Sequence, residues 1–269
     1  MISERERRQV AARMHLGVGQ AEREYILLCA LDLLSYADET TLAFCLKGGT
    51  ALRQLYFADW RHSEDLDFTV LPALPAERLE PALVSWLAQM GKRHGLAATL
   101  VDIHVPNGAA RARARVAGPL CHPQRLLLDF TLDEPVLLPP LRRTVVTGLF
   151  HELQPQVLCY TLEEILAEKL RAILQRGKAR DYYDVWRLLG EKHNHLDVDL
   201  ARRLLIAKCE HRQLPKATLG QLLDPSRLAQ AALFWQRDIR EQVPSEELPA
   251  WEAVVADLGR SLASVVPRE

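Results

Sequence analysis

The chain has 269 residues, of which 48% are hydrophobic and 26% are charged, and its formal net charge at pH 7 is −1. This composition is typical of a soluble globular protein with a real core, and it excludes a global field that would attract nucleic acid or a membrane. No apolar run reaches the ~18 residues of a membrane-spanning helix, and the N-terminal segment has no apolar signal region, so we expect a cytoplasmic protein with no membrane partner.

The first half of the chain alternates between helical and strand patterns. In chain order, we expect a helix over 22–36, a strand over 42–46, a helix after a glycine turn over about 50–58, a strand over 65–71, a helix ending at Gly95, strands over 97–105 and 111–118 around a turn at 106–108, a strand over 125–134 and a short strand within 141–150.

The second half reads as helical throughout. A capping box formed by Thr161 and Glu164 begins a helix over 161–176. Further helices are expected over 180–193, 197–212, 225–242 and 249–265. We therefore predict an α/β (α+β) domain over residues 1–155, followed by a helical C-terminal domain over residues 156–269. The five cysteines are scattered and form no C-x-x-C pair, which predicts buried free thiols.

Two carboxylates lie side by side on one predicted strand. In "RHSEDLDFTV" (61–70), polar and apolar residues alternate from Asp65 on, so Asp65 and Asp67 point to the same face. Like charges this close destabilise each other unless a cation lies between them, and Mg²⁺ prefers carboxylate and phosphate oxygens. Asp129, in the middle of the apolar run "LLLDFTL", is a third candidate. The alternatives are a solvated acidic face for the pair and a hydrogen-bonded structural role for Asp129.

A glycine turn precedes this strand. In "LKGGTAL" an apolar strand passes through Lys47, Gly48, Gly49 and Thr50 into a helix. Glycine backbone and the free N–H groups at the start of a helix bind phosphate, although the full P-loop pattern is absent. The simpler interpretation is a turn in which the glycines serve only geometry. A phosphate site followed by a metal-binding acid pair is what phosphoryl or nucleotidyl transfer needs.

Charged residues lie on the apolar faces of two successive helices. Lys169 falls within the apolar stripe of the helix over 161–176, and Asp181 and Asp184 share the inward face of the next helix. A buried charge needs a partner or a route to solvent. These residues, with Arg180 nearby, either form one polar site that binds phosphate or pair with one another as a buried salt bridge.

A third pattern, "RARAR", places three arginines on one face of the strand over 111–118. Such a row contacts a nucleic-acid backbone, or it is a solvated face of an edge strand that discourages aggregation.

The two segments "LKGGTALRQLYFADWRHSEDLDFTV" and "LEEILAEKLRAILQRGKARDYYDVWRLL" together resemble the AbiEii/AbiGii family of nucleotidyltransferase toxins, within the DNA polymerase β-like superfamily. The resemblance covers roughly residues 42–190 and implies a minimal mixed-sheet nucleotidyltransferase core followed by helices. It also implies roles for the singled-out residues, which are nucleotide binding by Gly48, Gly49 and Thr50 (threonine where serine is usual), metal binding by Asp65 and Asp67, less securely by Asp129, and catalysis by Lys169 and by Asp181 or Asp184.

The resemblance implies a toxin of a toxin–antitoxin or phage-defence system, with an antitoxin as partner. Some family members transfer nucleotides from an NTP to the 3′ end of tRNA, so we expect transfer to an RNA acceptor with Mg²⁺ or Mn²⁺. Modification of a protein, or of the chain itself, is a second hypothesis. A non-catalytic nucleotide-binding module is a third.

Overall fold

A mixed sheet of seven strands organises the first of the two units into which the chain divides, Met1–Tyr160 and Thr161–Glu269. The computed structural model describes residues 2–14, 17–36, 43–71, 76–118, 122–240, 242–243 and 248–268. The strand order is β3-β4-β5-β2-β1-β7-β6, with β2 parallel to β5 and β1 parallel to β7. The strands are β1 Ala43–Lys47, β2 Asp65–Leu71, β3 Ala97–His104, β4 Ala109–Ala117, β5 Pro123–Thr131, β6 Leu141–Thr144 and β7 Gln156–Cys159.

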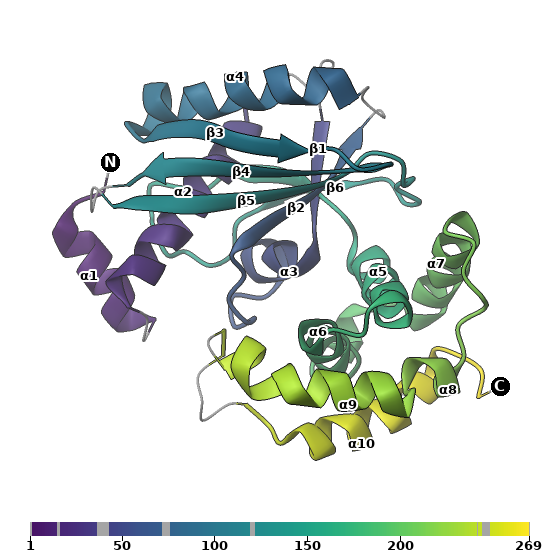
Figure 1. Cartoon of the computed structure of the whole chain (residues 1–269). Coiled ribbons are helices and arrows are strands. Elements are labelled where there is room, and N and C mark those ends of the chain that lie inside the picture. The colour runs from purple at the N-terminus through teal and green to yellow at the C-terminus, as the bar shows by residue number, and fades with distance from the viewer. Residues whose placement is uncertain are drawn as a thin grey trace. The chain divides into compact units, whose positions relative to one another are not determined.

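Helices cover the apolar face of this sheet (Figure 1). Helices α2 Val18–Leu34 and α4 Ala76–His94 pack against the sheet and against each other, and α1 Glu4–Arg13 packs on α2. Helix α3 Gly48–Ala51, which continues as the π-helical turn η1 Leu52–Tyr56, contacts β1 and β2. Phe44, Phe68 and Phe130 come from three neighbouring strands and pack against one another, and Trp86 of α4 meets Phe44 edge-on. This aromatic cluster anchors α4 to the sheet and leaves the opposite face of the central strands for polar side chains.

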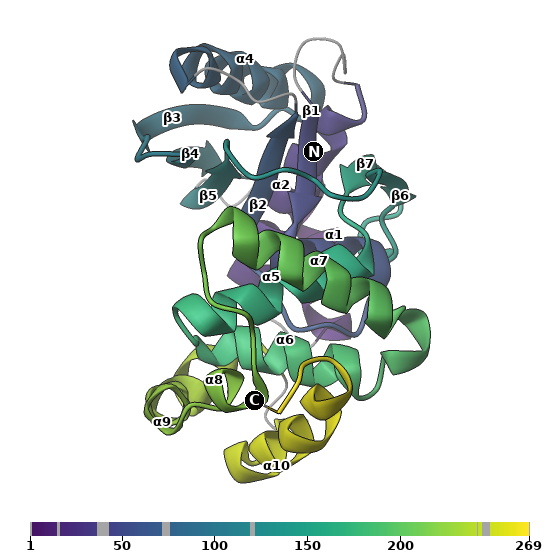
Figure 2. The same cartoon turned by 90° about the vertical axis from the view of Figure 1, so that its right-hand side faces the viewer.

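The second unit is helical. Its elements are α5 Leu162–Gln175, α6 Ala179–Leu189, the 3₁₀ turn η2 His193–His195, α7 Val198–His211, α8 Leu219–Leu222, α9 Pro225–Phe234 with the π-helical turn η3 Trp235–Ile239, and α10 Trp251–Ser261 with the 3₁₀ turn η4 Leu262–Ser264. Helix α5 packs against α6, α7 and α8, while α6 packs against α9 and α10 (Figure 2). Tyr182, Trp235 and Trp251 form an aromatic core beneath α6.

The predicted fold class is confirmed, with four local corrections. Helix α1 was not predicted; its capping box of Ser3 and Glu6 was overlooked because few apolar residues follow it. Strand β7 was also missed, because its four residues are too few to show a periodicity. Helix α3 begins at Gly48, so the two glycines lie inside the helix and do not precede it. Thr161 caps α5, but the Glu164 side chain lies 3.0 Å from Lys208 Nζ of α7 and does not complete a capping box.

Two further expectations concern the thiols and the membrane. Cys29, Cys45, Cys159 and Cys209 are buried thiols that form no disulfide in the described part of the chain, as predicted, and Cys121 lies outside the described residues. Within the described part of the chain, no helix combines the length and the apolar character needed to cross a bilayer.

Candidate functional site

The face of the central strands opposite the aromatic cluster carries a row of charged residues at one level of the sheet. Lys47 of β1 is the pairing partner of Asp67 of β2, Asp67 pairs with Asp129 of β5, and Asp129 pairs with Arg111 of β4. Directly paired residues point to the same face of a sheet. The register therefore places a cation, two carboxylates and a second cation in one line across four strands. In the sequence, the first and last of these residues, Lys47 and Asp129, are more than 80 positions apart.

Asp65 and Asp67 occupy this face two residues apart, and both are partly buried. The Asp129 side chain is 45% exposed, and its Oδ1 lies 3.6 Å from Arg111 Nε. The three predicted metal-binding residues thus share a face, and all of their donors are oxygen, which suits Mg²⁺ or Mn²⁺. Over the described ranges, no group of three or more His, Cys, Asp or Glu side chains is placed to hold a metal ion. The chain fits a metal held by one or two carboxylates together with substrate phosphates.

The glycine segment lies against this acid pair. Gly48 has φ +72°, and a Cβ built on it would lie 2.5 Å from Asp67 Oδ2. A Cβ on Gly49 would lie 2.7 Å from Arg61 Nη2 and 3.2 Å from Ser63 Oγ. Glycine is therefore required at Gly48, where φ is positive and the acid approaches the backbone closely, while at Gly49 a side chain would displace the Arg61 guanidinium group. The backbone of "GG" is thus flanked by a carboxylate on one side and a buried arginine on the other.

Lys47 and Thr50 are more deeply buried than a simple phosphate loop requires. Lys47 is 7% exposed, and its Nζ donates to Thr131 Oγ1 at 2.9 Å and lies over the Tyr160 ring. Thr50 is 1% exposed, and its hydroxyl donates to the carbonyl oxygen of Asp65 at 2.5 Å. The threonine thus ties the start of the helix to the first residue of the acidic strand, a structural task in addition to the predicted nucleotide contact.

A buried network that the sequence patterns did not reveal holds the loop before β2. Glu24 of α2 lies 2.8 Å from His62 Nδ1, accepts from Arg53 Nε at 3.2 Å and accepts from Gln54 Nε2 at 2.8 Å. Arg53 also donates to the Trp60 carbonyl at 2.6 Å. The network binds the segment that leads into Asp65 to two helices. Its signal in the sequence is slight, because Glu24 stands 29 residues before Arg53 and no local pattern links the two.

Burial alone would raise the pKa of the Glu24 carboxyl, but the contacts with His62, Arg53 and Gln54 outweigh it and lower the pKa below its ordinary value. Glu24 therefore stays ionised in the folded chain at neutral pH.

The second unit holds its own charged cluster. Asp181 and Asp184 of α6 are fully buried, and Lys169 of α5 reaches both, with its Nζ 3.1 Å from Asp181 Oδ1 and 2.7 Å from Asp184 Oδ2. The predicted inward orientation of all three residues is confirmed by their burial. The buried salt bridge, which the sequence offered as the alternative to a phosphate site, is present. Lys169 is the cation that the two aspartates share.

Two arginines flank this cluster. Arg176 Nε donates to Asp181 Oδ2 at 3.0 Å, and its side chain is 45% exposed. Arg180 is partly buried on α6. Burial alone would raise the pKa of Asp181, but Lys169, Arg176 and Arg180 together lower it. Asp181 is thus held ionised, and the cluster presents its guanidinium groups nearer to solvent than its lysine.

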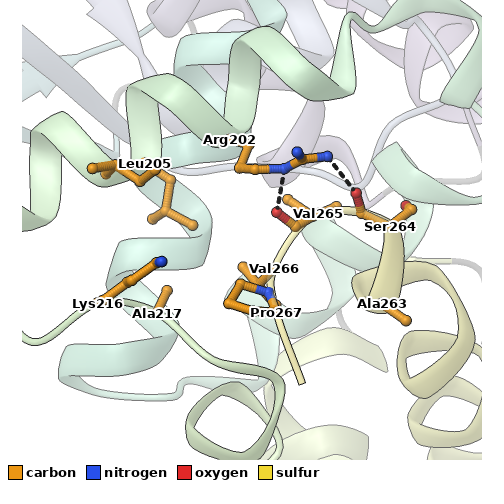
Figure 3. A pocket seen from close by; sticks show the side chains of 10 residues that line it. Arg202, Leu205, Lys216, Ala217, Ala263, Ser264, Val265, Val266 and Pro267 are labelled. Carbon is orange, nitrogen blue, oxygen red and sulfur yellow. Dashed lines mark hydrogen bonds between the residues drawn. The ribbon is translucent and has the colours of Figure 1, made fainter. Parts of the chain in front are cut away.

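A pocket of about 360 Å³ lies between α7 and the C-terminal segment of the second unit (Figure 3). Arg202 at its edge donates to the carbonyl oxygens of Val265, at 3.0 Å, and Ser264, at 2.9 Å. Its guanidinium group thus fastens the chain end to α7. None of the predicted site residues lines this pocket.

Known proteins share this architecture. Residues 32–257 match the family described as "Nucleotidyl transferase AbiEii toxin, Type IV TA system". Among solved structures, the chain is similar to MenT4, a nucleotidyltransferase toxin from Mycobacterium tuberculosis H37Rv, with a TM-score of 0.69 and 21% sequence identity over 96% of this chain and 89% of that one. No curated protein matches the sequence. The family match spans most of the chain, and it confirms the resemblance drawn from the sequence: the protein belongs to the AbiEii family of nucleotidyltransferase toxins of type IV toxin–antitoxin systems.

Proposed function

We propose that the first unit is the nucleotidyltransferase domain and transfers a nucleoside monophosphate from an NTP to a hydroxyl of an RNA acceptor, with the 3′ end of tRNA as the expected target. The observation that carries the proposal is the placement of Asp65 and Asp67 beside the Gly48–Gly49 backbone, with Lys47 and Arg61 next to them. A triphosphate needs backbone donors and cations, and the transferred phosphoryl group needs a carboxylate-bound metal. This corner of the sheet brings together the residue types that such a site needs, which supports the proposal.

Asp65 and Asp67 would hold the divalent metal, with Asp129 as a further oxygen donor on the same face. When bound, the metal would neutralise negative charge on the triphosphate and favour ionisation of the attacking hydroxyl.

The remaining groups position the reactants and balance their charge. In the reaction, the acceptor oxygen forms a bond to the α-phosphorus, the bond from that phosphorus to the α,β-bridging oxygen breaks, and pyrophosphate leaves. The hydroxyl proton passes to a carboxylate of the acid row or to water. The backbone of Gly48 and Gly49 would donate to the phosphates, and Arg61 and Lys47 would keep local positive charge at that end of β1.

The Lys169 cluster is proposed to serve the same reaction. Its two aspartates orient the lysine, whose charge, with that of Arg176 and Arg180, favours binding of a polyphosphate. Which of Asp181 and Asp184 matters more for catalysis is a question for single substitutions, because both contact the same Nζ atom.

The partner implied by the family is an antitoxin, and the expected location is the cytoplasm, where NTPs and tRNA occur together. The upstream neighbouring gene is the natural place to look for the antitoxin.

The test is transfer of label from each of the four α-³²P-NTPs to total RNA with Mg²⁺. We expect labelled tRNA-sized RNA with the parent chain and a reduction of at least about a hundredfold with Asp65→Asn, since loss of a single electrostatic contact to a transition state costs roughly 10²–10³ in rate. Glu80→Gln, on the exposed side of α4, is the matched control and should leave the rate unchanged. Label on protein that resists nuclease would replace the RNA proposal with protein modification.

A further inference from the structure

The arginines of the "RARAR" strand are not explained by protection of a sheet edge. Strand β4 pairs with β3 on one side and with β5 on the other, so its backbone has no unpaired edge to protect. Ala112 and Ala114 face the core, while Arg111, Arg113 and Arg115 face outward and are exposed. The cations therefore need another reason for their alignment.

The register places these arginines on the face that carries the acid row. Arg111 is the pairing partner of Asp129, which in turn pairs with Asp67. Arg113 pairs with Leu127, which lies level with Asp65. Successive arginines are spaced about 6.8 Å apart along the strand, so the row runs beside Asp67 and Asp65 and continues one level beyond them.

One pair of residues on this face destabilises the protein when no ligand is bound. Arg115 of β4 and Arg125 of β5 are direct antiparallel partners, both are exposed, and the third residue at that level is Thr99 of β3. Like charges directly opposite each other on a sheet are destabilising. Over the part of the chain that the structure describes, neither Arg115 nor Arg125 has a carboxylate within ion-pair distance.

The first two arginines have carboxylate neighbours that a phosphate can displace. Arg113 binds Asp102 of β3 with its Nε 2.9 Å from both carboxylate oxygens, and Arg111 lies 3.6 Å from Asp129. All four side chains are at least 42% exposed. Exposed ion pairs contribute little stability, so exchanging a carboxylate for a phosphodiester costs little.

We propose that Arg111, Arg113, Arg115 and Arg125 form a track for the phosphodiester backbone of the RNA acceptor, which leads the strand toward the acid row. The inference rests on the proposed function and names the surface that holds its acceptor. A polyanion explains the unpaired couple Arg115 and Arg125, because its phosphates provide the countercharge that the protein lacks there. Arg115 and Arg125 pair with each other one level beyond Asp65 on this face and are not level with either acid, so we expect their substitution to weaken RNA binding more than chemistry.

The experiment measures binding of a fluorescein-labelled single-stranded oligoribonucleotide by anisotropy, with the full chain carrying Asp65→Asn so that no transfer occurs. We expect Arg115→Ala/Arg125→Ala to weaken binding about tenfold at 0.15 M salt and to make the slope of log K against log[salt] shallower by about 1.4, the loss of two phosphate contacts. Arg115→Lys/Arg125→Lys should retain most of the affinity. Arg78→Ala/Lys92→Ala removes the same charge from exposed positions on α4 and should change neither quantity.

Several outcomes would overturn the track. They are an unchanged RNA affinity in Arg115→Ala/Arg125→Ala, an equal loss in the α4 control, and binding of polyglutamate as tight as that of RNA, which would indicate an acidic protein as the partner of this face. Failure of the proposed function is seen separately. A parent chain that binds the oligoribonucleotide through these arginines but transfers no label would contradict the transfer reaction and leave the track standing.

Discussion

Gly48 is the residue at which backbone geometry and the candidate chemistry meet. Its φ of +72° belongs to the left-handed region, and its Cα faces the carboxylate of Asp67. The backbone that is expected to bind phosphate and the carboxylate that is expected to bind metal therefore constrain each other. The structure thus explains why the motif has glycine at this position, which the sequence alone does not show.

Gly48→Ala should reduce nucleotidyl transfer by at least about tenfold and destabilise the chain by roughly 1–3 kcal/mol, because the new Cβ clashes with Asp67 Oδ2 and a side chain is strained at positive φ. Gly148→Ala is the matched control, since Gly148 has φ +56° but open space around its Cα. Equal losses of kcat/KM in the two variants, measured beside thermal unfolding, would show that backbone strain alone is responsible.

Lys169 allows the two interpretations of its cluster to be separated. Lys169→Met leaves two buried aspartates without that cation and should destabilise the chain by roughly 3–5 kcal/mol. Lys169→Met/Asp184→Asn removes one charge of each sign while Arg176 still pairs with Asp181, so most of the stability should return. Urea unfolding measures this recovery. If the double variant also recovers full transfer activity, the cluster is a structural salt bridge and nothing more.

At the scale of elements, the segment between α3 and β2 is the part that determines the position of Asp65. Two groups fasten it, with Thr50 bonded to the Asp65 carbonyl and Glu24 bonded to Arg53 and His62. Without these contacts, a long connection before the strand would leave the position of Asp65 poorly defined. The buried network thus serves positioning, and its charge makes that positioning sensitive to acid.

The pKa of Glu24 is lowered in the folded chain, so the unfolded chain binds more protons as the solution is acidified. The stabilisation from Glu24 is therefore fully present above its ordinary pKa of 4.5 and is lost as the pH falls through the lower folded value. Glu24→Gln should destabilise the chain by about 3 kcal/mol at pH 7, because Arg53 loses its buried counter-ion, and should flatten the fall in stability below pH 4.5. Chemical denaturation at a series of pH values tests this, and a Glu24→Gln curve parallel to that of Glu80→Gln would refute it.

At the scale of the whole molecule, each unit has its own core, one around the aromatic cluster of the sheet and one around Tyr182 and Trp235. A ligand that binds only the folded state increases the free energy of unfolding through mass action. This gives a measurement of the site that does not depend on finding the acceptor.

An NTP with Mg²⁺ at 100 times its dissociation constant should stabilise the chain by about 2.7 kcal/mol. For a chain of this size each kcal/mol corresponds to a shift of about 2–4 °C in Tm. Excess EDTA should abolish the shift without changing the Tm of the nucleotide-free chain, and Asp65→Asn should reduce it strongly. A full shift in EDTA would contradict the assignment of the acid pair to a metal.

The sequence by itself determined the elements whose patterns are strong. The alternation in β2 runs over 65–71 as predicted, and α4 ends at His94, one residue before Gly95, which has φ +69°. The inward direction of Lys169, Asp181 and Asp184 followed from helical period alone, because a side chain's face depends only on its place in its own helix. The family could be recognised for the same reason, since its motifs are local.

The tertiary structure alone decided which of these local features meet. Strand order and register bring Lys47, Asp67, Asp129 and Arg111 into one row, and no local pattern encodes the pairing of strands so far apart in the chain. It also placed β4 inside the sheet, which removed the edge-strand explanation of its arginines. The Glu24 network and the close approach of Arg61 to Gly49 were equally hidden, because a buried polar contact depends on packing between elements and leaves no periodic trace in the sequence.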